Sequence, residues 1–341
     1  MIKNIFTAII IVLFSFGFHN TVVAQAAESV EITGKLAQKF AAGITEADLK
    51  THLYIIASDE FEGRNTGESG QKLAAEYIKD FYVERNIASP LGGNNYFQTI
   101  SSEYLRANLK PSENVLAFIK GSEFPDEILV ISAHYDHLGM DKDGEIYNGA
   151  DDDGSGTVAV MAIAEAFQKA VEEGNGPKRS ILFLHVTGEE KGLLGSKYYV
   201  NFPVFPLENT IADLNIDMIG RTDASHENEP NYIYLIGSDK LSTELHLLSE
   251  EINNKFTKLK FDYTYNLDSD PNRFYYRSDH YNFAKNNIPV IFYFNGTHEN
   301  YHRISDTPDK INYELLAKRT QLVFFTAWEI ANRENRIMVD K

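Results

Sequence analysis

SAHYDHLG, at residues 132–139, is the first of three stretches around which this chain is arranged; the others are NGADDDGSGT (148–157) and HVTGEE (185–190). The first and third stretches each close an apolar run typical of a buried strand, and the second is an acidic, glycine-rich turn that opens a helix. Because sites in open α/β sheets form at the carboxyl ends of the strands, we expect one crevice to gather the polar side chains. Burying so many without a cation among them would be too costly. They are His134, Asp136, Asp151, Asp152, Asp153, Glu189 and Glu190.

Strand-like and helix-like segments alternate from residue 114 onward. This alternation predicts an α/β fold with a mostly parallel, mixed central sheet and helices on both faces. Before it, Thr45 to Asp48 forms a capping box that predicts a helix to Ile56, and 72–86 has helical periodicity. The later strands are predicted at 114–121, 127–133, 180–187, 210–220, 231–237 and 288–294, and the later helices at 154–173, 193–200, 240–256 and 313–333.

We expect a single domain over residues 27–341. The chain has 341 residues and 43% hydrophobic content, which suffice for one large core. No internal repeat or low-complexity linker divides it. Residues 27–110 supply helices that we expect to pack on the same sheet.

The first 26 residues have the pattern of a secretory signal peptide. Lys3 precedes the apolar run IFTAIIIVLFSFGF (5–18), and Ala24-Gln25-Ala26 fits the small-x-small cleavage pattern. The alternative is a membrane anchor, but a spanning helix needs ~20 apolar residues, and His19 interrupts this run. We therefore expect an exported protein, periplasmic or secreted, that is free of the membrane after cleavage.

The charge and the absence of cysteine exclude some classes of function. Formal net charge is −17, which makes the chain a poor partner for nucleic acid. With no cysteine in the sequence, disulfides contribute nothing to stability, and any zinc must be held by histidine and carboxylates.

The histidine at the end of the first stretch has two interpretations. By itself, His134 could be an ordinary hydrogen-bonded core histidine. Asp136 favours a metal ligand, because one intervening residue puts both side chains on the same face of an extended strand. A ligating histidine usually donates its second N–H to a carboxylate.

Each acidic group also has a structural alternative. Residues 151–153 could form a solvated turn or a helix start, Glu189 and Glu190 an exposed helix start, and Asp217 a buried ion pair. However, three adjacent carboxylates repel one another, and a central cation explains them more simply. Because Glu189 and Glu190 point different ways, one can bind metal while the other acts as general base. Nothing local distinguishes Tyr301 or His302.

Histidine and carboxylate ligands suit a first-row divalent metal. Imidazole favours zinc, with manganese and cobalt as alternatives. Two histidines and several carboxylates are more than one tetrahedral zinc needs, which indicates a site for two ions ~3.5–4 Å apart.

Five motifs carry a resemblance to a known family: AHYDH, NGADDDGSG, TGEEKGLLGS, NIDMIG and YHRISDTPDKI. Their order and spacing resemble those of the co-catalytic zinc aminopeptidases, family twenty-eight of the metallopeptidases. This family includes secreted bacterial leucyl aminopeptidases and glutamate carboxypeptidase. The resemblance covers roughly residues 45–332. Several larger members insert a protease-associated domain, which looks absent here because only residues 101–113 stand in its place.

The resemblance implies five metal ligands. His134 and Asp217 would bind one zinc, and Glu190 and His302 would bind the other. Asp152 would bridge the two ions and be followed by a cis peptide bond.

The resemblance also implies three catalytic roles. Glu189 would be the general base, Asp136 would orient His134, and Tyr301 would hydrogen-bond the developing oxyanion. The expected function is an aminopeptidase that acts on peptides with a free N-terminus. Three alternatives remain: a glutaminyl-peptide cyclase, which shares the fold but uses one zinc; a carboxypeptidase for acidic peptides; and a metal-free, receptor-like binding relative.

Overall fold

The computed structural model describes residues 34–106 and 108–341, so the predicted signal peptide lies outside the described residues. The strands are β1 (Phe97–Ile100), β2 (Ser112–Ile119), β3 (Phe124–His134), β4 (Gly139–Met140), β5 (Ile146–Tyr147), β6 (Arg179–Val186), β7 (Thr210–Ile216), β8 (Tyr232–Ile236), β9 (Lys260–Asp262) and β10 (Val290–Phe294). The helices are α2 (Glu46–Ile56), α3 (Ser69–Glu84), α4 (Ser102–Leu105), α5 (Gly156–Glu172), α6 (Leu194–Asn201), α7 (Thr243–Ile252), α8 (His280–Ala284) and α9 (Tyr313–Asn332).

Eight strands of the described residues form one mixed sheet, in the order β1-β2-β6-β3-β7-β10-β8-β9. The four central strands β6, β3, β7 and β10 are parallel to one another. At one edge β2 runs antiparallel to both β1 and β6, and at the other β8 is antiparallel to β10 and parallel to β9. The predicted mixed sheet with a parallel centre is therefore confirmed. The carboxyl ends of its four central strands lie side by side at one end of the sheet.

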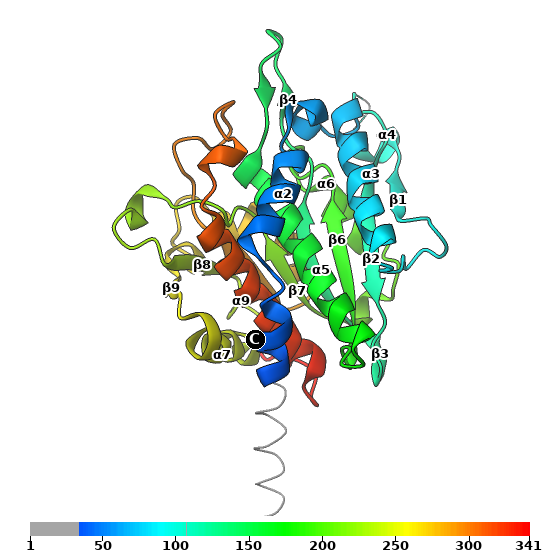
Figure 1. Cartoon of the computed structure of the whole chain (residues 1–341), viewed down its shortest axis with the longest axis vertical. Coiled ribbons are helices and arrows are strands. Elements are labelled where there is room, and N and C mark those ends of the chain that lie inside the picture. The colour runs from blue at the N-terminus through cyan, green and yellow to red at the C-terminus, as the bar shows by residue number, and fades with distance from the viewer. Residues whose placement is uncertain (1–33, 107) are drawn as a thin grey trace, which may run out of the picture.

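Helices cover both faces of this sheet. On one face α2, α3, α5 and α9 pack against alternate residues of the strands, such as Leu129 and Ile131 of β3, and Figure 1 shows α2, α5 and α9 in front of the sheet. On the other face Tyr199 of α6 and Phe283 of α8 pack against Val130. Neighbouring residues of β3 thus face opposite layers, which follows from the two-residue period of a strand and makes its apolar run continuous.

The N-terminal helices α2 and α3 pack on the sheet. The side chain of Thr45 accepts a hydrogen bond from the N–H of Asp48 and so caps α2. Leu53 of α2 and Ile78 of α3 belong to the same buried core as the sheet. No helix among the described residues is long and apolar enough to cross a membrane.

Several short elements were not predicted from the sequence. β1, β9 and the β4–β5 hairpin are too short and too exposed to show a clear hydrophobic pattern. The strand predicted to 220 ends at Ile216, because Met218 takes a positive φ of 62°. The helix predicted over 240–256 begins only at Thr243, where Ser242 caps it.

Candidate active site

The parallel strands bring the predicted ligands to one edge of the sheet. β3 ends at His134, β6 leads into Glu189 and Glu190, and β7 ends just before Asp217. The acidic turn before α5 supplies Asp152, and the loop after β10 supplies Tyr301 and His302. Strand register thus gathers side chains that are far apart in the sequence.

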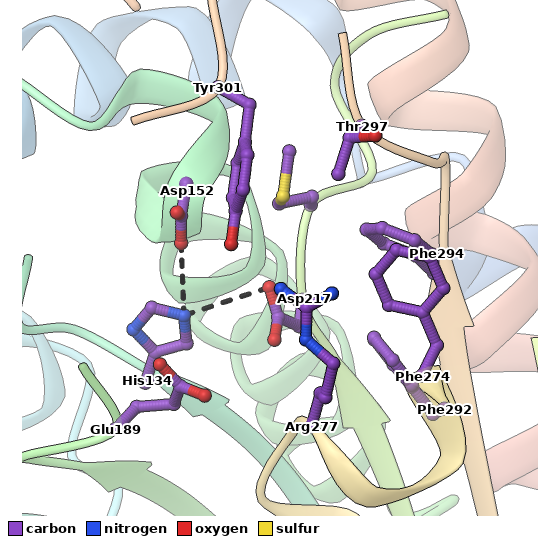
Figure 2. A pocket seen from close by; sticks show the side chains of 11 residues that line it. His134, Asp152, Glu189, Asp217, Phe274, Arg277, Phe292, Phe294, Thr297 and Tyr301 are labelled. Carbon is purple, nitrogen blue, oxygen red and sulfur yellow. Dashed lines mark ion pairs between the residues drawn. The ribbon is translucent and has the colours of Figure 1, made fainter. Parts of the chain in front are cut away.

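The first donor cluster consists of His134, Asp217 and Asp153, together with one oxygen of Asp152. Nε2 of His134 lies 3.2 Å from Asp152 Oδ1 and 3.6 Å from Asp217 Oδ1, as Figure 2 shows with dashed lines. Donor atoms of His134, Asp153 and Asp217 all lie within 4.8 Å of one another. Ser278 donates a 2.6 Å hydrogen bond to Oδ2 of Asp217, which leaves Oδ1 facing the imidazole.

The second donor cluster consists of Glu190, His302 and His137, together with the other oxygen of Asp152. Nε2 of His302 lies 3.0 Å from Asp152 Oδ2 and 3.4 Å from Glu190 Oε1. Nδ1 of His137 lies 2.9 Å from the same oxygen of Glu190. The two oxygens of Asp152 therefore face different clusters, as a bridging ligand requires.

The donor atoms fit bound cations better than they fit one another. Nε2 of His134, Nδ1 of His137, Oδ2 of Asp152 and Oε1 of Glu190 are buried and have no hydrogen-bond partner among the described residues. Their mutual contacts are short but lack the alignment of hydrogen bonds. Buried polar atoms without partners are rare and costly, and a metal ion in each cluster would satisfy them.

The backbone around Asp152 is held in place by buried contacts. The peptide bond between Asp152 and Asp153 is cis, as the family resemblance implies. Oδ2 of Asp306 accepts hydrogen bonds from the N–H groups of Asp151 and Asp152, at 3.0 and 3.2 Å. Oδ1 of Asp153 accepts from the N–H of Met218 at 3.0 Å. These bonds tie the acidic turn to the loops after β7 and β10.

The carboxylate of Asp136 lies closer to Thr66 and to the backbone of Glu189 than to the imidazole of His134. Its carboxylate accepts hydrogen bonds from the hydroxyl of Thr66 at 2.6 Å and from the N–H of Glu189 at 3.1 Å. Nδ1 of His134 lies 3.0 Å from the backbone carbonyl oxygen of Asp136 and 3.9 Å from its carboxylate. Of the two groups, the carbonyl is thus the nearer to the imidazole, and the carboxylate holds the backbone of Glu189.

Glu189 and Glu190 are neighbours with opposite pKa shifts. Burial raises the pKa of Glu189 well above its usual range, and the charges of Glu190 and Asp217 add to the rise. Burial and Asp152 would also raise the pKa of Glu190, but its contacts with His137 and His302 bring that pKa down to about 2. Environments that separate two carboxyl groups in this way are typical of a proton acceptor beside a permanently charged group.

The pocket beside the first donor cluster has an aromatic wall. Glu189 is half-buried and lines the pocket together with Tyr301 and Arg277. Figure 2 shows the hydroxyl of Tyr301 directed into this pocket, and burial raises the pKa of that hydroxyl, so it keeps its proton. The wall opposite consists of Phe274, Phe292 and Phe294.

Two contributors received no role from the sequence. His137 stands beside Asp136 in the first motif, but only its contact with Glu190 distinguishes it from an ordinary core histidine. Asp306 lies in the motif YHRISDTPDKI, but its bonds to the acidic turn join residues 154 and 155 positions apart. A pattern of neighbouring residues could not have found such bonds.

The chain is similar in sequence to a known peptidase family and to curated peptidases. A family model described as Peptidase family M28 matches residues 114–327. A probable zinc metalloprotease of Pyricularia oryzae is 26% identical over 304 residues, which cover 74% of this chain and 58% of that protein. Leucine aminopeptidase 2 of Trichophyton rubrum is 28% identical over 268 residues, covering 72% of this chain and 50% of that protein. The chain therefore spans between half and three fifths of the length of these two relatives.

Solved structures share the fold at lower identity. The LapA aminopeptidase of Legionella pneumophila has a TM-score of 0.68 at 19% identity, and the match covers 89% of this chain and 76% of that chain. A glutaminyl cyclase of Bacteroides thetaiotaomicron has a TM-score of 0.63 at 15% identity, and the match covers 86% of this chain and 99% of that chain. These likenesses show the fold and leave the activity to be argued from the site.

Proposed function

The chain belongs to peptidase family M28, and from that premise we propose that it is a zinc-dependent aminopeptidase that removes the N-terminal residue of peptides. Two relatives support the two halves of this proposal, since one is named a probable zinc metalloprotease and the other a leucine aminopeptidase. The observation that carries it is the pair of donor clusters that share Asp152 beside the half-buried Glu189.

In this proposal the chain holds two zinc ions. His134 and Asp217 would hold one, Glu190 and His302 the other, and Asp152 would bridge them. When bound, such ions polarise a carbonyl group and lower the pKa of water. The unpartnered buried donor atoms of both clusters support this assignment.

Glu189 would move the proton during hydrolysis. It would take a proton from the attacking water and then give it to the leaving amine, so that water is consumed and a free amine is released. Its raised pKa makes it a better proton acceptor than an ordinary carboxylate. The bond from its N–H to Asp136 would keep it facing the pocket.

Tyr301 would stabilise the charge that develops on the carbonyl oxygen. Its hydroxyl stays protonated because burial raises its pKa, so it can donate a hydrogen bond to an oxyanion. Its ring stacks on His302, with centroids 3.9 Å apart. This stacking would hold the phenol in position.

The surroundings of the pocket suit a free N-terminus. Carboxylates of Asp152, Glu189 and Asp217 line it and would attract an α-ammonium group. The aromatic wall would accept an apolar first side chain, because burial of such a side chain contributes ~1.5–3 kcal/mol. We therefore propose peptides with an unblocked, apolar first residue as substrates.

Two alternatives each have one supporting observation. The glutaminyl cyclase from Bacteroides thetaiotaomicron shares the fold, but a one-zinc enzyme gives no reason for a complete second donor cluster. A carboxypeptidase for acidic peptides is favoured only by Arg277, which lines the pocket. That side chain is exposed, and its guanidinium lies over the ring of Phe274 and forms no ion pair among the described residues.

One panel of substrates separates these activities. The zinc-loaded protein is assayed with a peptide that has a free apolar N-terminus, the same peptide N-acetylated, and a peptide with N-terminal glutamine. The proposal predicts cleavage of the first alone. Cleavage of the acetylated peptide from its carboxyl end would favour the carboxypeptidase, and cyclisation of glutamine without hydrolysis would favour the cyclase.

We also propose that the protein is exported, on the basis of residues 1–26. Expression of the full chain in a bacterial host, fractionation and N-terminal sequencing test this. A mature N-terminus at Ala27 outside the cytoplasm is expected. An intact Met1 in the cytoplasmic or membrane fraction would contradict export by cleavage.

A further inference from the structure

His137 is a fully buried imidazole that faces the second donor cluster. We propose that Nδ1 of His137 is a direct ligand of the second metal ion, in addition to Asp152, Glu190 and His302. This inference rests on the proposed two-zinc function and adds to it a residue that gives the two metal positions unequal affinity.

The contact between His137 and Glu190 has the distance of a hydrogen bond without its alignment. Nδ1 of His137 lies 2.9 Å from Oε1 of Glu190, yet both atoms are buried without a hydrogen-bond partner. A hydrogen bond would need the N–H to point at the oxygen. Two lone pairs that point at a common centre produce this combination of short distance and poor alignment.

The spacing of the four donor atoms matches one tetrahedral zinc. The four separations that join Nδ1 of His137 and Nε2 of His302 to the oxygens of Asp152 and Glu190 are 2.9, 3.8, 3.0 and 3.4 Å. Zinc bonds of ~2.0–2.1 Å at tetrahedral angles put neighbouring ligand atoms about 3.3 Å apart. The observed separations lie on both sides of that value, so small rearrangements suffice to bind the ion.

The fold holds the ring of His137 in this position. The N–H of His137 donates to the carbonyl oxygen of Arg64 at 3.1 Å, and the buried guanidinium of Arg64 donates to the carbonyls of Tyr135, Asn148 and Gly149. Gly149 has a φ of 57°, and a Cβ there would lie 2.5 Å from the imidazole ring. The imidazole ring therefore lies between the segment that follows β3 and the turn at Gly149. Hydrogen bonds from the side chain of Arg64 join these two segments.

A histidine here makes the two metal positions unequal. With His137 the second position has four protein donors, two of them nitrogen, which is the complete shell of a tetrahedral zinc. The first position has one nitrogen donor, from His134, together with carboxylates, and it borders the substrate pocket. We therefore infer that the second ion binds more tightly and that the first is the one lost early to a chelator.

The test compares His137→Gln with His185→Gln as a matched control. His185 is an equally buried imidazole on β6 that lies outside both donor clusters and contacts the hydroxyl of Tyr82. For wild type and both variants, zinc affinity is measured by competition with a chelator, and X-ray absorption at the zinc edge counts imidazole ligands. Circular dichroism of the metal-free proteins confirms that each is folded; should His137→Gln not fold, the imidazole count of wild-type protein alone remains decisive.

The ligand assignment predicts three imidazoles for two zinc ions in wild type and in His185→Gln, from His134, His137 and His302. It predicts two imidazoles in His137→Gln and a loss of affinity at one position that exceeds the ~10–100-fold typical of outer contacts. Two imidazoles in wild type, or a smaller loss with an unchanged count, would overturn the inference and leave His137 as a partner of Glu190. A wild-type protein that binds one ion would instead overturn the two-zinc function itself.

Discussion

The two donor clusters are supported by different parts of the fold. His134 and Asp217 of the first donor cluster stand at the ends of central strands, and the side chain of His134 is 1% exposed. Glu190 and His302 of the second stand on loops, and His302 is 36% exposed with a φ of 55°. A strand end is fixed by hydrogen bonds to neighbouring strands, whereas a loop needs contacts of its own. The second cluster should therefore depend on residues remote from the sheet.

The contacts that fix the second cluster are buried and polar. Asp306 holds the backbone of Asp152, and Arg64 joins the segment that carries His137 to the acidic turn. The left-handed backbone of His302 costs on the order of 1 kcal/mol or more for a residue other than glycine, which its neighbours must offset. A change at Arg64 should disturb the second cluster more than the first, whereas a change at Asp306 should disturb both, because both share Asp152.

Asp152→Asn should have the largest effect, because it removes the bridge on which both clusters depend. An amide cannot supply charge to two cations, so both ions should bind more weakly. We expect aminopeptidase turnover to fall by at least the ~10²–10⁴-fold typical of losing a general base. Steady-state kinetics with an aminoacyl p-nitroanilide at saturating zinc measures this. Loss of only one ion with turnover kept would mean that Asp152 serves a single cluster.

Glu189→Gln should separate proton transfer from metal binding. The amide keeps the shape of the side chain but cannot accept a proton, so kcat should fall by ~10²–10⁴-fold while zinc content stays at the wild-type value. Elemental analysis of the same sample provides the second readout. If kcat were within a few-fold of wild type, the base would have to be another group.

Arg64→Leu should affect the second cluster more than the first. It leaves carbonyls of Tyr135, Asn148 and Gly149 without their buried donor, at ~1–3 kcal/mol for each unsatisfied group. Urea unfolding of the metal-free protein should show a loss of about 3 kcal/mol or more. Zinc affinity should fall further at the second position than at the first.

Arg179→Leu is the matched control for that change. Arg179 is also a buried arginine that donates to carbonyls, but its partners are Ile330, Arg333 and Glu334 near the C-terminus. We expect this variant to lose stability with both zinc affinities unchanged. A loss of affinity here as large as in Arg64→Leu would mean that the clusters respond to global stability rather than to local contacts.

His185 shows what a buried imidazole does without a donor cluster around it. Burial lowers the pKa of His185 from 6.5 to about 3, whereas Asp152 and Glu190 outweigh burial and raise the pKa of His302 to about 10. Between pH 6.5 and about 3 the unfolded chain therefore binds a proton at His185 that the folded protein does not. The stability due to the neutral ring is complete above pH 6.5 and is lost as the pH falls toward 3.

His185→Gln should have the smallest effect, on the pH dependence of stability alone. Removing one titrating group lowers the slope of unfolding free energy against pH by up to ~1.4 kcal/mol per pH unit in that range. Urea titrations of the metal-free proteins at several pH values measure the slope. Parallel curves for wild type and variant would show that the ring is already charged when folded.

The sequence predicted the elements whose patterns are local. The buried runs that became β3 and β6 are continuous, and the capping box at Thr45 and Asp48 is a four-residue signal. The sequence pattern did not predict β1 and β9, because they are short edge strands with mixed exposure. Their pairing depends on neighbours that only the fold brings together.

Local sequence patterns likewise indicated some of the donor residues and missed others. Strand ends pointed to His134 and Asp217, and the resemblance added His302, which has no local signal. The sequence did not indicate His137, because Glu190, which it contacts in the fold, lies 53 positions later in the chain. Register between two parallel strands brings the two residues together, and no spacing within either motif encodes it.

The most direct test of the two-cluster account is the zinc content of the active protein. Wild-type protein is loaded with zinc, dialysed and measured by elemental analysis beside its turnover of an aminoacyl p-nitroanilide, at several ratios of zinc to protein. If both donor clusters take part in the reaction, full activity requires two bound ions per chain. Full activity with a single ion per chain would contradict the account, because the second donor cluster would then have no part in the reaction.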